Sequence, residues 1–326
     1  MSRTPISGLP PMFPGGNRVG AEEEAAVVEA VRSKRLFRYY GVDDGPSAVA
    51  SFEADLAARL GSTHAIAVAS GTTALVAALA AAGIGPGDQV IVPAYTWVST
   101  AAAVVAVGAV PVIAEIDDAL TIDAADASTL VGPRTRAIIP VHMRGAPADM
   151  AAVMDLARQH DLIVIEDAAQ AIGGTFGGRA LGTIGDIGCF SLQFNKIITC
   201  GEGGVVVTDD DRLHARALMY HDVAAAVREE AAGQPGIFGI TCRLSELQGA
   251  VAGVQLGRLD EIIADCRSRR ERIVDLVADA VASSGIRLRA QHDEAGDTGI
   301  ALILLCPEAD IADRLARALR ESGLDA

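Results

Sequence analysis

Lys196 has an unusual setting for a lysine, the stretch SLQFNKIITCGEGG at positions 191–204. Its neighbours are small, uncharged or apolar, and glycines follow within a few residues. A lysine on a solvated surface hairpin is one explanation. The other is a lysine held in a dry pocket, where desolvation and nearby positive charge lower the amine pKa until the neutral amine can attack a carbonyl.

Asp167 and Gln170 follow the apolar run LIVIED (162–167), which is typical of a buried strand. A carboxylate at the end of such a strand needs a cationic partner, because an unpaired buried charge is costly. Asp167 can instead be the N-cap of a following helix. The local pattern fits both interpretations.

Two further stretches carry groups that suit a flat, phosphorylated ligand. Gly71 and Thr72 stand between a strand-like run and an Ala-rich helical pattern, and the N–H groups of a helix N-terminus bind phosphate. Junctions of this kind are also common without any ligand. Trp97, the only tryptophan in the chain, stands where a helix is expected to begin. Its ring can stack on a ligand or fill the core.

The combination of these groups is what pyridoxal phosphate requires. The aldehyde of this cofactor needs a lysine for a Schiff base, and its pyridinium nitrogen needs an anion so that the ring can accept electrons. Lys196 and Asp167 supply these two groups. Gly71 and Thr72 supply a binding site for the phosphate, and Trp97 supplies an aromatic ring that can stack on the cofactor.

The elements that must position these residues alternate along the chain between helical patterns and short, apolar, β-branched runs. Such an alternation predicts an α/β fold with a mostly parallel sheet flanked by helices on both faces. Ligands bind at the carboxyl ends of the strands in such sheets. The predicted strands are 64–70, 89–94, 110–116, 135–142, 162–167, 187–192 and 203–209.

Helical spacing of apolar residues predicts the helices between these strands. In one of them, Val49, Phe52, Leu56 and Leu60 share one face. The predicted helices are 21–33, 46–60, 71–83, 97–108 and 148–160.

The pattern changes after about residue 241. Residues 243–285 predict one long helix or two consecutive helices, followed by a strand at 299–306 and a helix at 309–323. We therefore expect a large domain over 18–257, a small C-terminal α+β domain over 258–326, and an N-terminal arm rich in Pro and Gly over 1–17.

Composition narrows the choice of partners and compartment. The net charge of −15 argues against nucleic acid and against an anionic membrane surface. The five cysteines are widely spaced and form no Cys/His cluster, so neither a disulfide framework nor a metal site is expected. The N-terminus lacks the apolar core of a signal peptide, and the apolar runs are interrupted by Ser, Thr and Gly. We expect a cytoplasmic protein.

Several motifs resemble the DegT/DnrJ/EryC1/StrS family of sugar aminotransferases, which belong to the fold type I group of pyridoxal-phosphate enzymes. The resemblance runs from RYYG (38–41) to RLSELQGA (243–250). Between these ends lie FEADLAARLGSTHAIAVASGTTAL, GDQVIVPAYTWVST, PVHMRGAPADM, IVIEDAAQAIGGTFGGRALGTIGDIGCFS and NKIITCGEGGVVVTDD.

The resemblance implies a role for each candidate residue. Lys196 would form the Schiff base with pyridoxal 5'-phosphate and later move the proton between cofactor and substrate. Asp167 would pair with the pyridinium nitrogen, Gln170 would lie near the ring hydroxyl, and Trp97 would stack on the ring. The phosphate would be bound by Gly71, Thr72 and Ser191.

The resemblance also implies a homodimer in which a neighbouring subunit completes each active site. The family usually has Gly-x-Asn-x-Arg before its Ser-Glu motif, and the Asn reaches the phosphate in the partner subunit. Here GITCRLSEL places Thr241 at that position, with a shorter reach. Members of the family also continue beyond the segment LRESGLDA, so we expect the small domain to be shortened.

The implied function is transfer of an amino group from L-glutamate or L-glutamine to a keto group of a nucleotide-linked sugar or a cyclitol, in secondary-metabolite or cell-surface sugar biosynthesis. Relatives that dehydrate deoxysugars replace the lysine with histidine, so Lys196 favours transamination. Two alternatives stay open. One is a dehydratase or lyase of the amino-ketone aromatising type, which also keeps the lysine. The other is a truncated, inactive relative that acts as a partner subunit.

Overall fold

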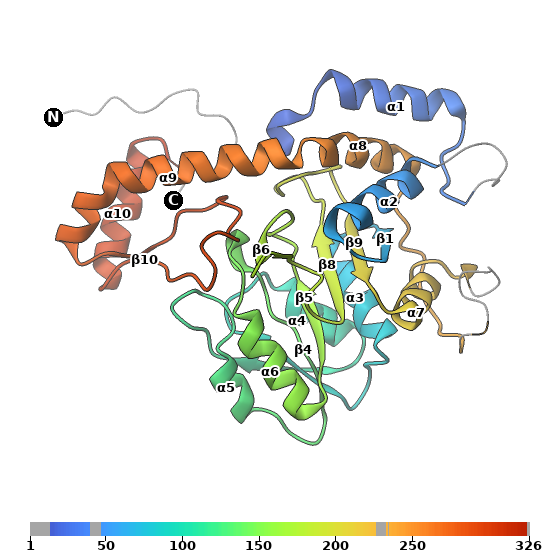
Figure 1. Ribbon diagram of the computed structural model, residues 1–326, viewed down its shortest axis with the longest axis horizontal. Helices are drawn as coiled ribbons and strands as arrows, with labels where there is room; N and C mark the ends of the chain where they lie inside the picture. The colour runs from blue at the N-terminus through green and yellow to red at the C-terminus, as the bar shows by residue number, and fades with distance from the viewer. Residues whose placement is uncertain (1–13, 40–46, 226–232, 234, 325–326) are drawn as a thin grey trace.

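The computed structural model describes residues 14–39, 47–225, 233 and 235–324 (Figure 1). Most of the predicted N-terminal arm, residues 1–17, lies outside these ranges. A seven-stranded sheet with the strand order β1-β9-β8-β5-β4-β2-β3 forms the centre of the molecule. Its strands are β1 (His64–Val68), β2 (Gln89–Pro93), β3 (Val110–Ala114), β4 (Thr135–Ile138), β5 (Ile163–Asp167), β8 (Ile187–Ser191) and β9 (Gly204–Thr208).

The sheet is mostly parallel, as the sequence predicts. Strands β2, β3, β4, β5 and β8 pair with one another in parallel, whereas β9 runs antiparallel to both of its neighbours, β8 and β1. The carboxyl ends of the parallel strands therefore share one edge of the sheet with the beginning of β9. The seven predicted strands are confirmed, and β4 is shorter than the predicted 135–142.

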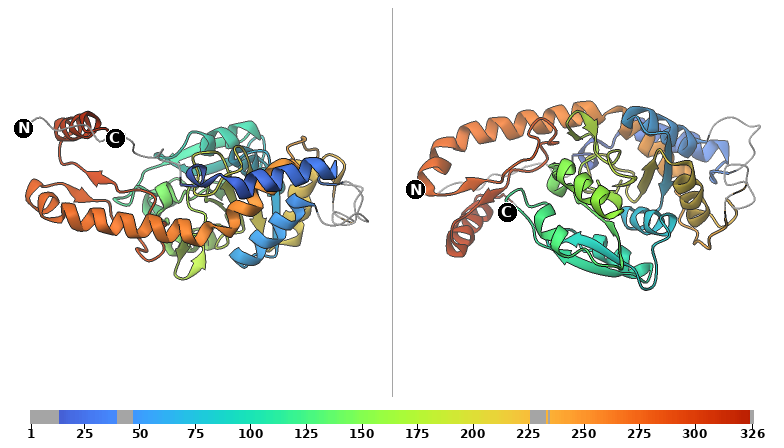
Figure 2. Two further views of the ribbon diagram at one scale, coloured as in Figure 1. Left: turned by 90° about the horizontal axis from the view of Figure 1, so that it is seen from above. Right: turned by 60° about the horizontal axis from the view of Figure 1, so that its bottom comes forward.

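Helices cover both faces of the sheet (Figures 1 and 2). Residues of α3, α4 and α7 pack in one apolar cluster, and residues of α2, α8, α5 and α6 pack against the opposite face in two others. The helices are α1 (Ala21–Ser33), α2 (Ala48–Leu60), α3 (Gly71–Ala81), α4 (Ser99–Ala106), α5 (Ala124–Thr129), α6 (Met150–His160), α7 (Asp211–His221), α8 (Glu246–Gly257), α9 (Leu259–Ser284) and α10 (Ala309–Glu321).

Helix α2 shows why these segments are helical. The Ser47 side chain accepts a hydrogen bond from the Ala50 N–H at its start, and Gly61 ends it in the left-handed region at φ 71°. Val49, Phe52, Leu56 and Leu60, the face expected from the spacing, are all buried. This face packs with α8 and the β1–β9–β8 side of the sheet in one apolar cluster.

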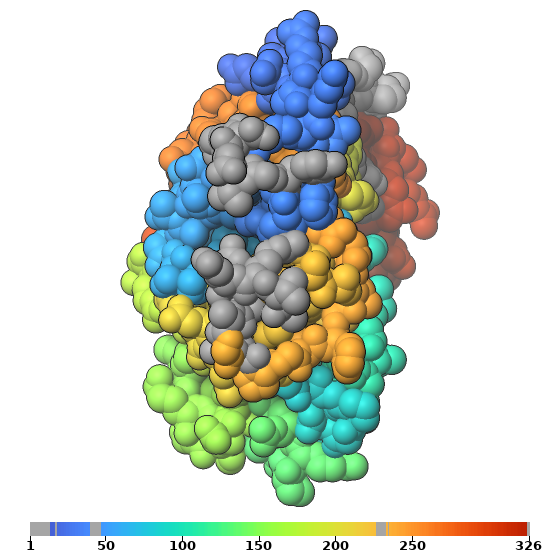
Figure 3. Space-filling model, turned by 90° about the vertical axis from the view of Figure 1, so that its right-hand side faces the viewer, coloured from blue at the N-terminus to red at the C-terminus, as the bar shows by residue number. Residues whose placement is uncertain are grey.

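The N-terminal helix lies beside a helix from far along the chain. Helix α1 packs against α8, and the space-filling view shows N-terminal residues next to residues of the last third of the chain on one face (Figure 3). The Glu23 side chain accepts a hydrogen bond from Gln255 at 2.9 Å, and Arg258 forms an ion pair with the same carboxylate at 2.8 Å. Buried polar contacts therefore join α1 to the end of α8.

Residues 243–285 form two consecutive helices, α8 and α9, and α9 projects from the body of the molecule with α10 near its far end (Figures 1 and 2). The strand predicted at 299–306 is wrong for most of its length, because only Leu304–Leu305 (β11) pairs, with β10 (Arg287–Leu288). Just before this range, the Thr298 N–H donates to the Gly145 carbonyl at 3.0 Å. The division into domains 18–257 and 258–326 stays a prediction.

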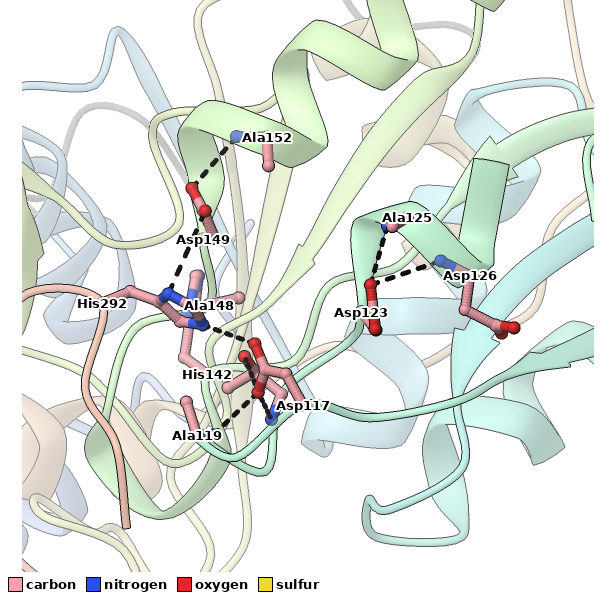
Figure 4. Close-up of polar contacts among 11 residues, drawn as sticks. Asp117, Ala119, Asp123, Ala125, Asp126, His142, Ala148, Asp149, Ala152 and His292 are labelled. Carbon is pink, nitrogen blue, oxygen red and sulfur yellow. Dashed lines mark hydrogen bonds and ion pairs between the residues drawn. The ribbon is translucent and has the colours of Figure 1, made fainter. Parts of the chain in front are cut away.

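Polar contacts tie the segment after β10 back to the sheet (Figure 4). His292 Nε2 lies 2.6 Å from Asp117 Oδ2, and His292 Nδ1 lies 4.0 Å from Asp149 Oδ2. Asp149 is also the N-cap of α6, since its Oδ1 accepts from the Ala152 N–H at 3.0 Å. Across the described part of the chain, no helix combines the length and apolar character needed to cross a membrane.

Candidate active site

A cavity of about 610 Å³ lies at the carboxyl edge of the sheet. Residues that follow β1, β2, β4, β5 and β8 line it. The structure brings seven of the eight predicted site residues to this cavity: Gly71, Thr72, Trp97, Asp167, Gln170, Ser191 and Lys196. Thr241 is the exception; it is exposed and does not line the cavity.

The N-terminus of α3 forms one end of the cavity. Ser70 is the N-cap, and its side chain accepts a hydrogen bond from the Thr73 N–H at 3.1 Å. Among the described residues, none accepts a hydrogen bond from the N–H of Gly71 or Thr72. Two backbone donors at the positive end of a helix are therefore open to an anion in the cavity.

Ser191 reaches the same end because Gly71 allows it. A Cβ atom at Gly71 would lie 2.7 Å from the Ser191 Cβ, which is closer than two non-bonded carbon atoms approach each other. The absence of a side chain at Gly71 thus lets the end of β8 lie against the start of α3. The Ser191 hydroxyl accepts a hydrogen bond from the Gln193 N–H at 3.3 Å and lines the cavity.

Asp167 lies at the end of β5 and is only 5% exposed. Its Oδ2 accepts a hydrogen bond from the Thr100 hydroxyl at 2.8 Å, and its Oδ1 accepts from the Ala169 N–H at 3.2 Å. Burial raises the pKa of Asp167 although these bonds oppose the change. No described helix begins after Asp167 before β6 (Thr175–Phe176), so the N-cap interpretation is wrong.

Lys196 lies in the connection between β8 and β9, partly buried and at the wall of the cavity. Burial lowers the pKa of its amine, the Asp167 carboxylate opposes this change, and the Arg144 guanidinium adds to it. The connection does join two antiparallel neighbours, but a fully solvated lysine is not what the structure shows. The hairpin explanation for this stretch is therefore wrong.

Trp97 and Gln170 both line the cavity. Trp97 is 67% exposed, so it does not fill the core, and its ring is available at the wall of the cavity. The side-chain oxygen of Gln170 accepts a hydrogen bond from the Arg144 N–H at 3.1 Å, and its amide group lies 3.8 Å from the Met143 sulfur. Gln170 is thus held by the turn that follows β4.

Just before this turn, His142 is fully buried and held from two sides. Its Nδ1 accepts a hydrogen bond from the Ala148 N–H at 3.2 Å, so Nε2 carries the proton and donates to Glu166 at 2.9 Å. Burial raises the pKa of Glu166, but hydrogen bonds from His142 and from backbone N–H groups outweigh it and lower the pKa. The pair anchors the chain next to Asp167 without facing the cavity.

Sequence reasoning missed several residues that the site uses. Thr100, which is buried, binds Asp167, and Tyr95 and Arg144 line the cavity. For Arg144, position at the end of a predicted strand was the available signal. For Thr100 no local signal exists, because which helical side chain faces the sheet is set by the packing of α4.

The fold and the cavity define the class of protein. A mostly parallel sheet with a lysine, a buried aspartate and a helix N-terminus around one cavity at its carboxyl edge is the arrangement of fold type I pyridoxal-phosphate-dependent transferases. The chain belongs to the DegT/DnrJ/EryC1/StrS aminotransferase family, whose profile matches residues 17–326.

Two curated relatives are similar over most of this chain. GDP-perosamine synthase of Caulobacter vibrioides is 41% identical over 245 residues, which are 75% of this chain and 64% of that protein. L-glutamine:2-deoxy-scyllo-inosose aminotransferase of Streptoalloteichus tenebrarius is 37% identical over 297 residues, 88% of this chain and 68% of that protein. The chain thus spans about two thirds of the length of these relatives.

Solved structures share the fold over nearly the whole chain. An aminotransferase from Psychrobacter cryohalolentis has a TM-score of 0.85 at 30% identity, over 99% of this chain and 83% of that one. A 3-amino-5-hydroxybenzoic acid synthase has a TM-score of 0.84 at 31% identity, over 98% and 81%. The ntda protein of Bacillus subtilis, with the bound cofactor pmp, has a TM-score of 0.84 at 26% identity, over 98% and 72%.

Proposed function

We propose that this chain is a pyridoxal-phosphate-dependent aminotransferase that moves an amino group from L-glutamate or L-glutamine to a keto group of a nucleotide-linked sugar or a cyclitol. The observation that carries the proposal is the placement of Lys196 and Asp167 on one cavity, electrostatically coupled, beside the N-terminus of α3. The names of the two curated relatives, a perosamine synthase and a glutamine-dependent cyclitol aminotransferase, support the substrate class.

The residues present fit the cofactor. The N–H groups of Gly71 and Thr72 and the Ser191 hydroxyl would bind its phosphate, and Gly71 leaves no side chain in the way. Asp167 is buried with a raised pKa and needs a cation, which the ring nitrogen would supply. Trp97 would stack on the ring and Gln170 would lie beside it. The bound cofactor would supply an electron sink for the substrate carbon.

Lys196 would act first as the covalent anchor and then as the proton carrier. Burial lowers the pKa of its amine, so a larger share of Lys196 is neutral and nucleophilic near neutral pH. Once released from the cofactor, the same amine would take a proton from one carbon and return it to another. The Asp167 carboxylate limits how far the pKa of Lys196 falls.

The Lys196→Ala variant tests this assignment. We expect the purified parent protein to carry a visible absorption band that borohydride abolishes, and mass spectrometry of the reduced protein to place the cofactor on the peptide that contains Lys196. The variant should lose the covalent adduct and the activity. An adduct on another lysine, or unchanged activity in the variant, contradicts the proposal.

A second function is favoured by one similarity. The fold matches a 3-amino-5-hydroxybenzoic acid synthase at 31% identity. The resemblance to the family implies that a lyase of the aromatising type would also keep the lysine. Product analysis separates the two reactions. A transaminase consumes the amino donor in a one-to-one ratio with the keto substrate, whereas the lyase converts an amino-ketone without any donor.

We also propose a homodimer whose subunits share their active sites. Thr241 lies away from its own cavity and is exposed, as are its neighbours Phe238 and Ile240. Exposed apolar residues next to a polar residue of this kind suit an interface better than a solvated surface.

The five free cysteines and the acidic net charge support a cytoplasmic location.

A further inference from the structure

Arg144 lines the cavity with an exposed side chain. Among the described residues, no aspartate or glutamate forms an ion pair with it, although the chain has 42 acidic residues against 27 lysines and arginines. Most other cavity residues are uncharged. The side chain of Arg144 is therefore a cation that faces the cavity and has no described anionic partner.

The backbone of Arg144 is held in a costly conformation. Its φ of 53° and ψ of 38° lie in the left-handed region, which an arginine rarely adopts. The next residue, Gly145, also has a positive φ, and a Cβ atom there would lie 1.9 Å from the Thr298 hydroxyl. Strained backbone of this kind persists where the surroundings fix it, and it is often found at binding sites.

Three groups fix the turn around Arg144. Arg289 is buried and donates to the Met143 carbonyl at 2.7 Å and to the Arg144 carbonyl at 3.3 Å. Thr298 donates its N–H to the Gly145 carbonyl. The Arg144 N–H is taken by Gln170. The base of the arginine is thus immobilised while its guanidinium is left facing the cavity.

We propose that Arg144 binds an oxyanion of the substrate, either the carboxylate of the amino-acid donor or a phosphate of a nucleotide-linked sugar. A planar guanidinium binds either group through two parallel hydrogen bonds. Tyr95 and Asn195 line the same cavity and offer further donors. The inference rests on the proposed function, since it names a substrate group that Arg144 holds near Lys196.

Other charges of the cavity constrain where the anion lies. The carboxylates of Glu202 and Asp167 also line the cavity, and each repels an anion from its side. Arg144 lowers the pKa of Lys196 in the free site. A bound oxyanion would offset the charge of Arg144 and so make Lys196 more basic when substrate arrives.

The experiment compares Arg144→Gln and Arg144→Lys with the parent protein and with the control Arg158→Gln. Arg158 pairs with Asp155 on the exposed face of α6, outside this cavity. Titration calorimetry at low salt measures binding of glutarate and, separately, of inorganic pyrophosphate to cofactor-loaded protein. Glutarate stands for the donor carboxylate and pyrophosphate for the nucleotide phosphates.

We expect Arg144→Gln to weaken one probe by about 10- to 100-fold, Arg144→Lys to weaken it less, and Arg158→Gln to leave both unchanged. If Arg144→Gln weakens only the binding of glutarate, Arg144 binds the donor carboxylate. If it weakens only the binding of pyrophosphate, Arg144 binds the nucleotide phosphate. Unchanged binding of both probes in Arg144→Gln, or no binding to the parent protein, overturns the inference. The visible absorption band of each sample reports separately whether the proposed cofactor function holds.

Discussion

At the scale of single residues, the site depends on two groups whose charges are coupled, Asp167 and Lys196, and on the Thr100 hydroxyl that binds Asp167. Burial raises the pKa of Asp167 and lowers the pKa of Lys196, so each would be neutral more often without the other. The Thr100 hydroxyl donates to the Asp167 carboxylate and, with the Ala169 N–H, opposes the rise in the pKa of Asp167 that burial causes. A neutral Asp167 could not stabilise a protonated ring nitrogen.

Replacing Thr100 with Val should therefore shift the pH profile of the reaction. The lost hydrogen bond removes a contribution that lowers the pKa of Asp167, so this pKa should rise further above its ordinary value. The acidic limb of activity, where Asp167 becomes protonated, should move to higher pH by the same amount. Thr100→Ser keeps the hydroxyl and should retain the parent profile. An unmoved acidic limb in Thr100→Val would show that the bond does not set this ionisation.

The residues of the candidate site could be predicted from the sequence where they stand at the ends of predicted strands. Lys196, Asp167, Gly71 and Trp97 stand beside runs whose strand character is plain, so the shared edge of a parallel sheet predicts their meeting. Thr100 and Arg144 were missed because their roles depend on how α4 packs and on a left-handed turn. Neither feature leaves a periodic signal in the chain.

At the scale of elements, Arg289 in the segment after β10 donates to the carbonyls of Met143 and Arg144 in the turn at the cavity, and a buried ion pair within that segment holds Arg289 in place. Arg289 lies 3.2 Å from Asp297, and their side chains are 2% and 1% exposed. Asp297 also accepts from Gln291 at 2.6 Å and from the Gly299 N–H at 2.7 Å. Contacts far apart in sequence therefore hold the turn that carries Arg144.

The Arg289→Met variant removes this clamp while keeping much of the volume. It leaves the Asp297 carboxylate buried without its cation, which should lower the free energy of unfolding by about 3–5 kcal/mol. Arg287→Gln is a matched control, because Arg287 pairs with Asp118 on the surface with 61% and 68% exposure, and should cost less than about 1 kcal/mol. Thermal or urea unfolding measures both. Equal, small effects would show that the buried pair is not a clamp.

His292 gives the same region a pH dependence. The hydrogen bond to Asp117 raises the pKa of His292 although burial opposes it. Burial raises the pKa of Asp117, but the His292 hydrogen bond and backbone N–H groups outweigh it and lower that pKa. A raised histidine pKa stabilises the fold fully below the unfolded value of about 6.5 and loses this effect as pH rises through the folded value.

The pair is therefore most favourable at a pH above the ordinary pKa of Asp117, about 4, and below that of His292, about 6.5. His292→Gln should lower the unfolding free energy more at about pH 5.5 than at about pH 8.5. The difference should be modest, of order 1 kcal/mol or less, because both side chains are partly exposed. Chemical denaturation at the two pH values measures it. An equal loss of unfolding free energy at the two pH values would show that the contact does not depend on protonation of His292.

Helices and strands were predicted best where the residues that pack in the core are those that the spacing of apolar residues in the sequence indicates. All seven strands of the central sheet and helix α2, whose four core residues share one face, follow from the spacing of apolar residues. The strand predicted at 299–306 is reduced to Leu304–Leu305, which pair with β10, while Thr298 just before the predicted strand is held by the turn at Gly145. The short helix α5 and the helix α7 were not predicted.

At the scale of the whole molecule, the exposed apolar residues near Thr241 predict self-association. Phe238 is fully exposed at 103% and Ile240 is 51% exposed. In a homodimer of the proposed kind, Phe238→Ser should weaken dimerisation by roughly 10- to 30-fold, as loss of a buried aromatic anchor does. Sedimentation velocity over a range of concentrations measures the change.

The control for this experiment is Leu276→Ser, which removes an exposed apolar residue of α9 (76% exposed) distant in sequence from Thr241. It should leave the association constant unchanged. A monomeric parent protein would contradict the proposed dimer, and equal effects of the two substitutions would indicate unspecific association through apolar surface.

The boundary between α8 and α9 gives the molecule a mechanical property. Helix α9 has 26 residues, of which only Leu259, Ile262 and Ile263 near its start are buried, so it is fixed at one end and extends away from the sheet. A helix of that length is about 39 Å long, and a swing of about 5° about its root carries its tip through roughly 3 Å. A small change in the angle between α8 and α9 near Gly257 would therefore move the far end of α9 by several ångströms, and a spectroscopic label near Leu276 would record this displacement.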